Sequence, residues 1–198
     1  MPAPPPVLCL ASASPRRRAL LAQIGVSHVV RGANLDETPH AQETPRDYVA
    51  RVAAAKACTI RSIDAALPVL GADTIVVVDG AMFGKPDDRA QGLAMLASLA
   101  GRAHEVLSAV ALADARGVQI AVSASTVRFR ALSAQECRDY WDSGEPHDKA
   151  GAYAIQGLAA AFIESLHGSY SGVMGLPLFE TAALLRAAGL PYGRGLPV

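Results

Sequence analysis

The sequence contains few cysteines, few aromatic residues and no excess of charge of either sign. Cys9, Cys58 and Cys137 are odd in number and lack the spacing of metal ligands, so we expect free thiols in a reducing compartment. The 18 basic and 18 acidic side chains cancel, and aromatic residues make up only 5% of the chain. These features argue against a nucleic-acid partner held by bulk charge, so any phosphate binding must come from a focused pocket.

Long apolar runs and targeting signals are also absent. Although 51% of the residues are hydrophobic, no stretch approaches the roughly 20 uncharged apolar residues that a membrane span needs. The proline-rich opening lacks the basic and apolar segments of a signal peptide. We therefore expect a cytoplasmic protein without a membrane partner. Since no repeat or linker divides the 198 residues, we predict a single domain over residues 1–198.

Segments with helical and extended patterns alternate along the chain, which predicts an α/β fold with a mixed sheet. Asp79-Gly80 is typical of a two-residue hairpin turn, from which residues 81–85 return as a strand. The other expected strands are 7–10, 26–31, 68–78, 104–113, 118–130 and 158–166. One expected helix begins at Pro15. The other expected helices span 44–63, 88–99, 133–142 and 178–188.

The helix that follows Ser14 concentrates positive charge at its start. Ser14 is a favoured N-cap, and Pro15 suits the first helical position. Arg16, Arg17 and Arg18 then lie in a turn where the helix dipole is itself positive, so an anion is the simplest compensation. Free N–H groups and guanidinium groups together form a phosphate site. The helical period directs Arg17 and Arg16 toward the sheet and leaves Arg18 in solvent. The alternative is a helix whose arginines lie on the surface or pair with carboxylates.

Asp73 stands inside a strand that is otherwise apolar. A buried carboxylate is costly unless it is hydrogen-bonded, paired or bound to a metal. If Asp79-Gly80 forms the two-residue turn, the register places Lys85 opposite Thr74 and its ammonium next to Asp73. The pair is then either structural, or a metal-anchoring or water-activating carboxylate beside a phosphate-binding lysine.

Four further polar residues are candidates with weaker signals. Glu37 lies in a polar loop, where an acidic residue is usually only solvated. Lys56 lies on a helix face that should pack, so its side chain either extends to solvent or points into a cleft. The glycine-containing segment 148–157 allows close backbone approach to a ligand, with Lys149 on phosphate and Gln156 on a base edge. The alternative for this segment is an ordinary loop.

Taken together, these motifs resemble the Maf family of nucleoside triphosphate pyrophosphatases over nearly the whole chain. The resemblance implies a Maf/ITPase-like fold with two lobes around a central cleft, a divalent cation (Mg²⁺ or Mn²⁺) and usually a homodimer. It implies hydrolysis of a nucleoside triphosphate between the α and β phosphorus atoms. The motifs that carry it are Ser12-Ala-Ser-Pro-Arg-Arg17, Glu37, Ala-Lys56-Ala, Gly71-Ala-Asp-Thr74, Gly84-Lys-Pro86, Gly101-Arg-Ala-His104, the segment 148–157, and Gly168-Ser-Tyr through Gly175-Leu-Pro-Leu.

The resemblance also assigns roles to individual residues. The segment 148–157 is similar to the branch of the family that acts on dTTP and UTP, rather than to the branch that acts on 7-methyl-GTP. Asp73 is the expected proton acceptor, and the expected specificity positions are Arg16, Thr74 and Gln156. Ser108, where a threonine is more usual, and the segment 171–174 depart from the family pattern. These departures bear on substrate preference and not on the reaction.

The combined hypothesis is a dTTP/UTP pyrophosphatase that could also remove non-standard nucleotides. The residues expected to hold the triphosphate are Ser14, Arg16, Arg17, Lys56, Lys85 and Lys149, with Glu37 and Asp73 on the divalent cation. Two alternatives stay open from the sequence. One is a nucleotide-binding regulator of cell division or septum formation without significant catalysis, and the other is a pyrophosphatase for 7-methyl-GTP.

Overall fold

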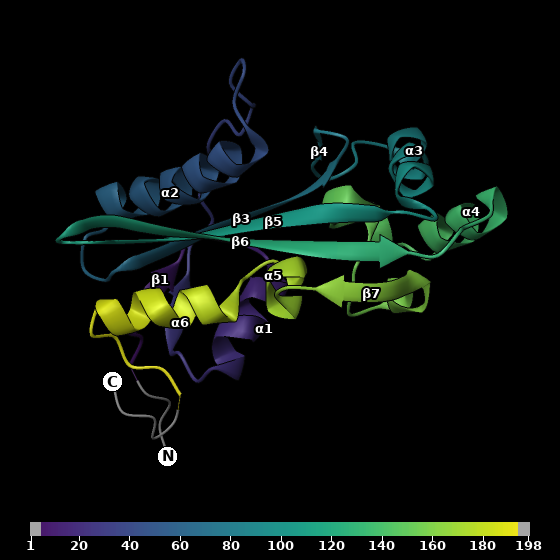
Figure 1. Ribbon diagram of the computed structural model, residues 1–198. Coiled ribbons are helices and arrows are strands. Elements are labelled where there is room, and N and C mark those ends of the chain that lie inside the picture. The colour runs from purple at the N-terminus through teal and green to yellow at the C-terminus, as the bar shows by residue number, and fades with distance from the viewer. Residues whose placement is uncertain (1–4, 194–198) are drawn as a thin grey trace.

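The computed structural model describes residues 5–193, in which one seven-stranded mixed sheet carries helices on both faces (Figure 1). The strands are β1 (Leu8–Leu10), β2 (His28–Val30), β3 (Val69–Val78), β4 (Ala81–Phe83), β5 (Ala103–Asp114), β6 (Gly117–Phe129) and β7 (Ile163–His167). The helices are α1 (Pro15–Gln23), α2 (Pro45–Ile63), α3 (Arg89–Leu99), α4 (Ala134–Asp142), α5 (Tyr170–Met174) and α6 (Leu178–Ala187). Short 3₁₀ helices are η1 (Glu145–Asp148), η2 (Ala150–Ala152) and η3 (Leu158–Phe162).

The sheet confirms the predicted α/β class. Its strands follow the order β2-β1-β3-β5-β6-β7, and β4 pairs with β3 off this path. β1 pairs in parallel with β2 and β3, whereas β3, β5, β6 and β7 pair antiparallel. The prediction of one domain over residues 1–198 stays a prediction, and its two ends, 1–4 and 194–198, lie outside the described residues.

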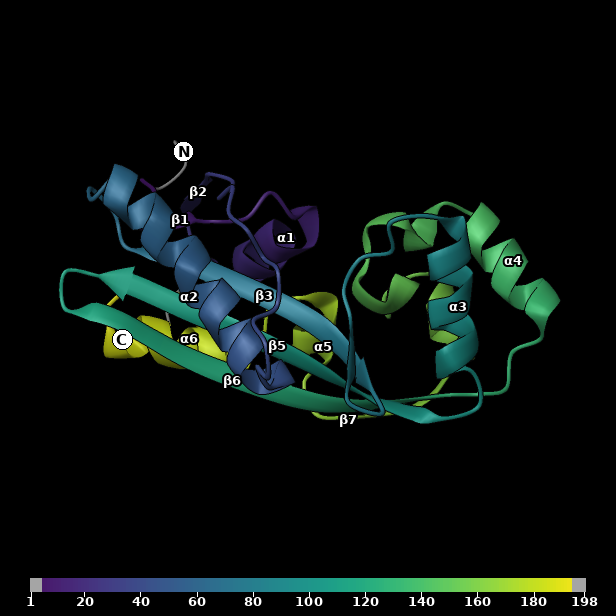
Figure 2. The ribbon, with the colours of Figure 1, turned by 90° about the horizontal axis from the view of Figure 1, so that it is seen from above.

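Two lobes share the long strands of the sheet (Figure 2). β5 and β6 pair without interruption from Ala103↔Arg128 to Asp114↔Gly117. One lobe carries α1, α2 and α6, and the other carries α3 and α4, so the paired strands connect the lobes as a common spine. This arrangement agrees with the two lobes that the resemblance implied.

In the first lobe, α2 covers one face of the sheet, and α1, α5 and α6 cover the other (Figure 1). Leucines of α1 and α6 form a buried cluster on the second face. On the first face, small residues make the contact between α2 and β3. The two elements are so close that a Cβ atom on Gly71 would lie 2.2 Å from the carbonyl oxygen of Ala53. Only glycine fits at this point of β3, and it lets α2 approach the strand that carries Asp73.

Most predicted elements are confirmed, and two differences have local causes. The strand predicted over 158–166 is wrong, because its first half is η3 and only its second half is β7. The Leu158 and Ala159 N–H groups donate to the carboxylate of Glu145 at 2.9 and 3.3 Å, which holds a tight turn instead of a strand. The unpredicted α5 has five residues, too few to show a helical period.

Two further expectations concern the chain as a whole. Within residues 5–193, no helix is both long enough and apolar enough to cross a membrane. Cys9, Cys58 and Cys137 are free thiols, as expected, with Cys9 and Cys137 buried and Cys58 exposed.

The core of the second lobe contains a buried histidine. His104 is 4% exposed, and its ring meets those of Phe129 and Tyr153 edge to face at centroid distances of 5.1 and 5.4 Å. Its Nε2 atom lies 2.9 Å from the Tyr153 hydroxyl, whereas Nδ1 has no partner among residues 5–193. Burial, and then the positive charge of Arg102, lower the pKa of His104 from 6.5 to about 4. His104 is therefore neutral at pH 7.

This histidine should make the fold sensitive to acid. Between pH 6.5 and pH 4 the unfolded chain takes up a proton that folded His104 does not, so stability falls with falling pH. His104→Gln keeps a polar group for Tyr153 but cannot titrate. We expect the difference in unfolding free energy between wild type and this variant to shrink by about 2–3 kcal/mol from pH 7 to pH 4.5. Urea titrations at both pH values measure it, and a difference that is independent of pH contradicts the prediction.

Candidate active site

A cavity of about 600 Å³ lies between the lobes. Its wall is formed by the start of α1, the loop after β2, the middle of β3, the segment after β4, the segment 148–156 and the end of α5. Every residue predicted for the site lines this cavity: Ser14, Arg16, Arg17, Glu37, Lys56, Asp73, Thr74, Lys85, Lys149 and Gln156. Residues that are far apart in the sequence therefore converge on one place.

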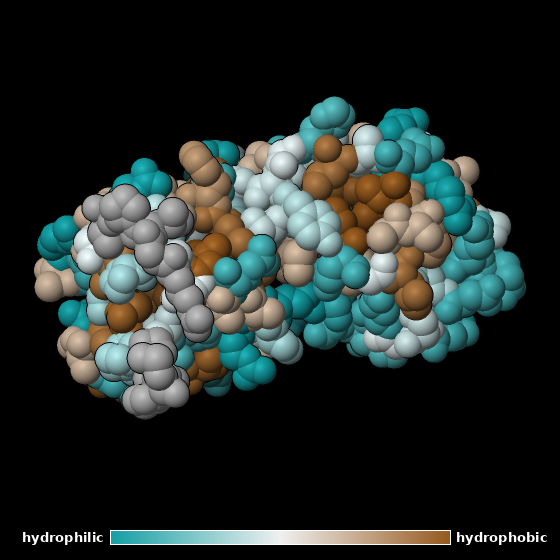
Figure 3. Space-filling view, turned by 90° about the horizontal axis from the view of Figure 1, so that it is seen from below, coloured by the Kyte–Doolittle hydropathy of each residue, from teal (hydrophilic) through white to brown (hydrophobic). Residues whose placement is uncertain are grey.

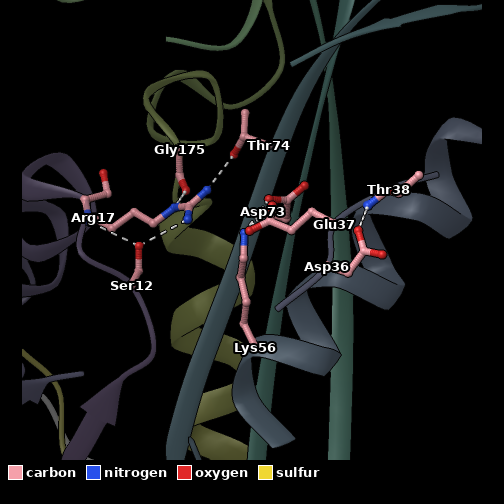
Figure 4. Close-up of polar contacts among 10 residues, drawn as sticks. Ser12, Arg17, Asp36, Glu37, Thr38, Lys56, Asp73, Thr74 and Gly175 are labelled. Atoms are coloured by element: carbon pink, nitrogen blue, oxygen red, sulfur yellow. Dashed lines mark hydrogen bonds and ion pairs between the residues drawn. The ribbon is translucent and has the colours of Figure 1, made fainter. Parts of the chain in front are cut away.

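A buried ion pair forms the centre of the cavity wall (Figure 4). The Lys56 ammonium, from α2, lies 2.9 Å from a carboxylate oxygen of Asp73 on β3 and 2.9 Å from one of Glu37. Asp73 is 6% exposed and Lys56 8%. Of the two interpretations of Lys56, the side chain that points into the cleft is the one observed. The close approach of α2 at Gly71 brings this ammonium to the strand.

Opposing influences act on the Asp73 carboxyl. Burial raises its pKa above the ordinary value of 3.8, and the positive charges of Lys56 and then Arg17 oppose this rise. Tyr48 also lines the cavity. Its pKa is raised to about 12, mainly by burial and then by the negative charges of Asp73 and Glu37. A carboxylate with a raised pKa and a fixed position is suited to accept a proton.

Arg17 forms a second polar cluster on the opposite side of β3 (Figure 4). Its Nε donates to the Gly175 carbonyl at 2.7 Å, and its Nη1 and Nη2 donate to the hydroxyls of Ser12 and Thr74 at 3.2 and 3.5 Å. These contacts confirm that Arg17 lies over the sheet, and they leave further N–H donors on Nη1 and Nη2. Burial lowers its pKa from 12.5, and the negative charges of Asp73 and Glu37 oppose this fall.

The start of α1 is open, as an anion site requires. Ser14 is the N-cap residue, but its side chain makes no capping hydrogen bond, so the first N–H groups of the helix lack that partner. Arg16 reaches the other lobe, where its guanidinium lies 3.7 Å from the Asp148 carboxylate. Arg18 is exposed, as predicted. Ser14 and Arg16 can therefore act with Arg17 on one anionic ligand.

The predicted position of Lys85 is wrong in one respect. The hairpin forms as expected, with Val78 opposite Ala81, but β4 ends where Phe83 pairs with Val76. The chain then leaves the sheet, and the Gly84 carbonyl accepts a hydrogen bond from the Gly151 N–H at 3.0 Å. Lys85 is exposed at the cavity and has no ion pair within the described part of the chain. The ammonium beside Asp73 is that of Lys56 instead.

The segment 148–156 supplies the wall from the second lobe. Lys149 pairs with Asp148, which also faces Arg16. Gln156 is exposed, and its amide makes no hydrogen bond within residues 5–193, so it is free to contact a ligand. Sequence reasoning missed Tyr48 and Gly175. No local pattern marks Tyr48 as a residue of the site, and the contact of Gly175 with Arg17 spans 158 positions of the chain.

The carboxylates of the cavity could hold a divalent cation only together with a ligand. Within residues 5–193, no group of three or more His, Cys, Asp or Glu side chains has the arrangement of a metal site. Glu37 and Asp73 nevertheless face one point, the Lys56 ammonium. Mg²⁺ is commonly bound by one or two carboxylates together with substrate phosphates. The donor set here fits that pattern.

Comparison with known proteins places the chain in context. The model of the family described as "Maf-like protein" matches residues 7–188. A dTTP/UTP pyrophosphatase from Bordetella parapertussis is 54% identical over 95% of this chain and 95% of its own length. One from Methylobacillus flagellatus is 51% identical over 91% and 92%.

Solved structures add a distant likeness. A nucleoside-triphosphatase / dITP/XTP pyrophosphatase from Mycobacterium abscessus superposes with a TM-score of 0.45 and 19% identity, over 93% of this chain and 98% of that chain. At this level the likeness carries no conclusion.

The central ion pair predicts a pH-dependent stability defect in Lys56→Met. The variant leaves Asp73 as an unpaired buried charge, which should lower the unfolding free energy by about 3 kcal/mol at pH 7. Because the folded-state pKa of Asp73 is raised, protonation should remove this charge and reduce the defect as the pH falls. Lys56→Met/Asp73→Asn should recover most of the loss at pH 7. Urea titrations test both statements, and a double variant as unstable as Lys56→Met at every pH contradicts them.

Proposed function

The chain belongs to the Maf-like protein family, and we propose that it hydrolyses dTTP and UTP to the nucleoside monophosphate and pyrophosphate. The observation that carries this proposal is the buried Asp73 carboxylate, held by Lys56 in a cavity whose wall carries more cations than carboxylates. The names of the relatives, more than 50% identical in two cases, support the substrates.

The triphosphate would be held by cations from both lobes. Ser14, Arg16 and Arg17 present the open end of α1, and Lys85 and Lys149 face it across the cavity. Guanidinium groups and free helix N–H groups bind phosphate oxygens directionally, whereas the two ammonium groups add charge. As negative charge shifts onto the leaving pyrophosphate, these fixed cations stabilise the transition state.

Asp73 is the proposed proton acceptor. A water oxygen forms a bond to phosphorus, the bridging P–O bond between the α and β phosphorus atoms breaks, and Asp73 accepts the proton of the water. Burial raises the pKa of Asp73, which favours proton uptake, and Lys56 opposes this rise and keeps the carboxylate oriented. Pyrophosphate leaves with the electron pair of the broken bond.

A divalent cation, Mg²⁺ or Mn²⁺, fits beside Glu37 and Asp73. When bound, it would withdraw charge from the phosphate oxygens. Lys56 pairs with both carboxylates and thereby limits their mutual repulsion. This contact holds the Glu37 carboxylate at the site, although Glu37 belongs to a solvent-facing loop.

The base would be recognised by side chains of the same cavity wall. Arg16, Thr74 and Gln156 are the proposed specificity residues, and the free amide of Gln156 offers both a donor and an acceptor to a base edge. A donor and an acceptor side by side suit the imide edge of a pyrimidine, which also carries both.

The reaction is tested by pyrophosphate release with Mg²⁺ from dTTP, UTP, CTP, GTP and 7-methyl-GTP. We expect dTTP and UTP to be cleaved, EDTA to suppress the release, and Asp73→Asn to lower kcat by on the order of 10³-fold, since the amide cannot accept the proton. Asp36→Asn is the matched control, because Asp36 lies on the same loop as Glu37 but does not line the cavity. It should retain wild-type activity.

The outcomes separate the competing functions. Calorimetric binding of dTTP without cleavage would support the regulatory protein of cell division and remove the enzymatic proposal. Preference for 7-methyl-GTP would move the chain to the other substrate branch. An active Asp73→Asn variant would refute the role of Asp73 as proton acceptor.

We further propose that the enzyme is a cytoplasmic homodimer without a nucleic-acid partner. The unpaired, exposed Cys58 is consistent with a reducing compartment. On the face that carries α1, α5 and α6, hydrophobic side chains reach the surface between hydrophilic ones (Figure 3). Phe179 of α6 is 81% exposed and Tyr170 of α5 is 49% exposed. Such exposure favours burial against a second copy.

The dimer has a direct test. Sedimentation of the wild type should give twice the mass of one chain, and Phe179→Glu should shift the equilibrium to the monomer, because it would place a charge in the contact. A wild type that sediments as a monomer at all concentrations refutes the dimer, and an unaffected Phe179→Glu dimer refutes this face.

A further inference from the structure

A chain of hydrogen bonds leaves the cavity and ends inside the protein. It starts at Arg17, whose Nη2 lies 3.5 Å from the Thr74 hydroxyl. The Thr74 hydroxyl lies 2.9 Å from that of Ser108, which lies 2.6 Å from the carbonyl oxygen of Gly172 in α5. Thr74 and Ser108 are directly opposite on β3 and β5. Thr74 lines the cavity, whereas Ser108 is 1% exposed and does not.

The direction of each hydrogen bond in this chain follows from the groups at its two ends. A carbonyl can only accept, so at 2.6 Å the single proton of Ser108 must point to Gly172, since two bare oxygens at that distance would repel. Ser108 then has only lone pairs left for Thr74, and the Thr74 proton must point to Ser108. A guanidinium can only donate, which fixes the remaining bond from Arg17 to Thr74.

The Thr74 hydroxyl is consequently an acceptor toward the cavity. Its proton is directed to Ser108 and one of its two lone pairs accepts from Arg17, which leaves one lone pair for a ligand in the cavity. Phosphate oxygens are acceptors too, so Thr74 has no proton to offer them and is unsuited to hold the triphosphate. Its natural partner is an N–H group of the base. Uracil and thymine carry such a group at N3, where cytosine carries a lone pair.

We propose that Ser108 is a positioning residue that holds the Thr74 hydroxyl as an acceptor and thereby favours uracil and thymine over cytosine. This inference rests on the proposed function. Consecutive residues of β3 point to opposite faces of the sheet, so Asp73 faces Lys56 and Thr74 faces α5. The proton acceptor and the base-reading hydroxyl are separated on one strand.

The segment at the end of the hydrogen-bond chain is itself held firmly. The Gly172 N–H donates to the Ser169 hydroxyl at 3.0 Å, and the Gly172 carbonyl accepts a second hydrogen bond from the Gly175 N–H at 2.9 Å. The acceptor that orients Ser108 therefore cannot turn away easily. Arg17 fixes the same segment from the other side through the Gly175 carbonyl.

The test compares kcat and KM for UTP, dTTP and CTP in Ser108→Ala, Ser108→Thr and wild type. In Ser108→Ala the Thr74 proton is released and can turn toward N3 of cytosine. We expect the ratio of kcat/KM for UTP to that for CTP to fall about tenfold, chiefly through KM, which corresponds to one hydrogen bond. Ser108→Thr keeps a hydroxyl and should restore the ratio.

Controls separate this role from a structural one. Ser123→Ala removes a buried serine that pairs with Ser108 across β5 and β6, and it should leave the ratio unchanged. Equal losses for UTP and CTP in Ser108→Ala, or no recovery in Ser108→Thr, overturn the positioning role. A wild type that cleaves no pyrimidine triphosphate overturns the proposed function itself, whereas wild-type cleavage with an unaltered ratio in Ser108→Ala overturns only this inference.

Discussion

The structure depends on the placement of one charged pair against the middle of the sheet. Asp73 and Lys56 are both nearly inaccessible, and desolvation of two charges is expensive unless they are close and well oriented. Their separation of 2.9 Å requires α2 to lie directly on β3, and Gly71 is what permits that distance. A side chain at position 71 would move the helix, and with it the ammonium that makes the buried carboxylate tolerable. Packing and chemistry thus constrain the same three residues.

The two faces of β3 divide the tasks of the cavity. Since side chains alternate along a strand, Asp73 belongs to the face under α2 and Thr74 to the face under α5. Arg17 contacts the second face and the end of α5, and its charge also reaches Asp73. β5 and β6 extend through both lobes and pair without interruption. The segments that contribute cations from each lobe therefore pack on the same pair of strands.

Local signals in the sequence were sufficient for most elements, and the residues predicted for the site, several of them from the family resemblance, line one cavity. The apolar strand that contains Asp73 and the cationic start of α1 are local patterns, and both lie where they were predicted. The partner of Asp73 was not predictable from the hairpin register, because β4 stops at Phe83 and the competing ammonium comes from a helix. The turn at Leu158 depends on Glu145, and the contact of Arg17 with Gly175 spans most of the chain. Tertiary partners of this kind have no local signature.

The charge balance of the chain conceals the character of the cavity. Basic and acidic residues are equal in number over the whole sequence, yet cations outnumber carboxylates on the cavity wall. The carboxylates there are already engaged: Glu37 and Asp73 by Lys56, and Asp148 by Arg16 and Lys149. Within residues 5–193, the hydrogen bonds of Arg17 go to neutral groups, and Lys85 has no ion pair. A polyanion would supply what these groups lack, and because the cations belong to both lobes, it would be held by both at once. Net charge therefore says little about ligand preference here, and the local distribution decides it. The cations on this wall are Arg16, Arg17, Lys56, Lys85 and Lys149.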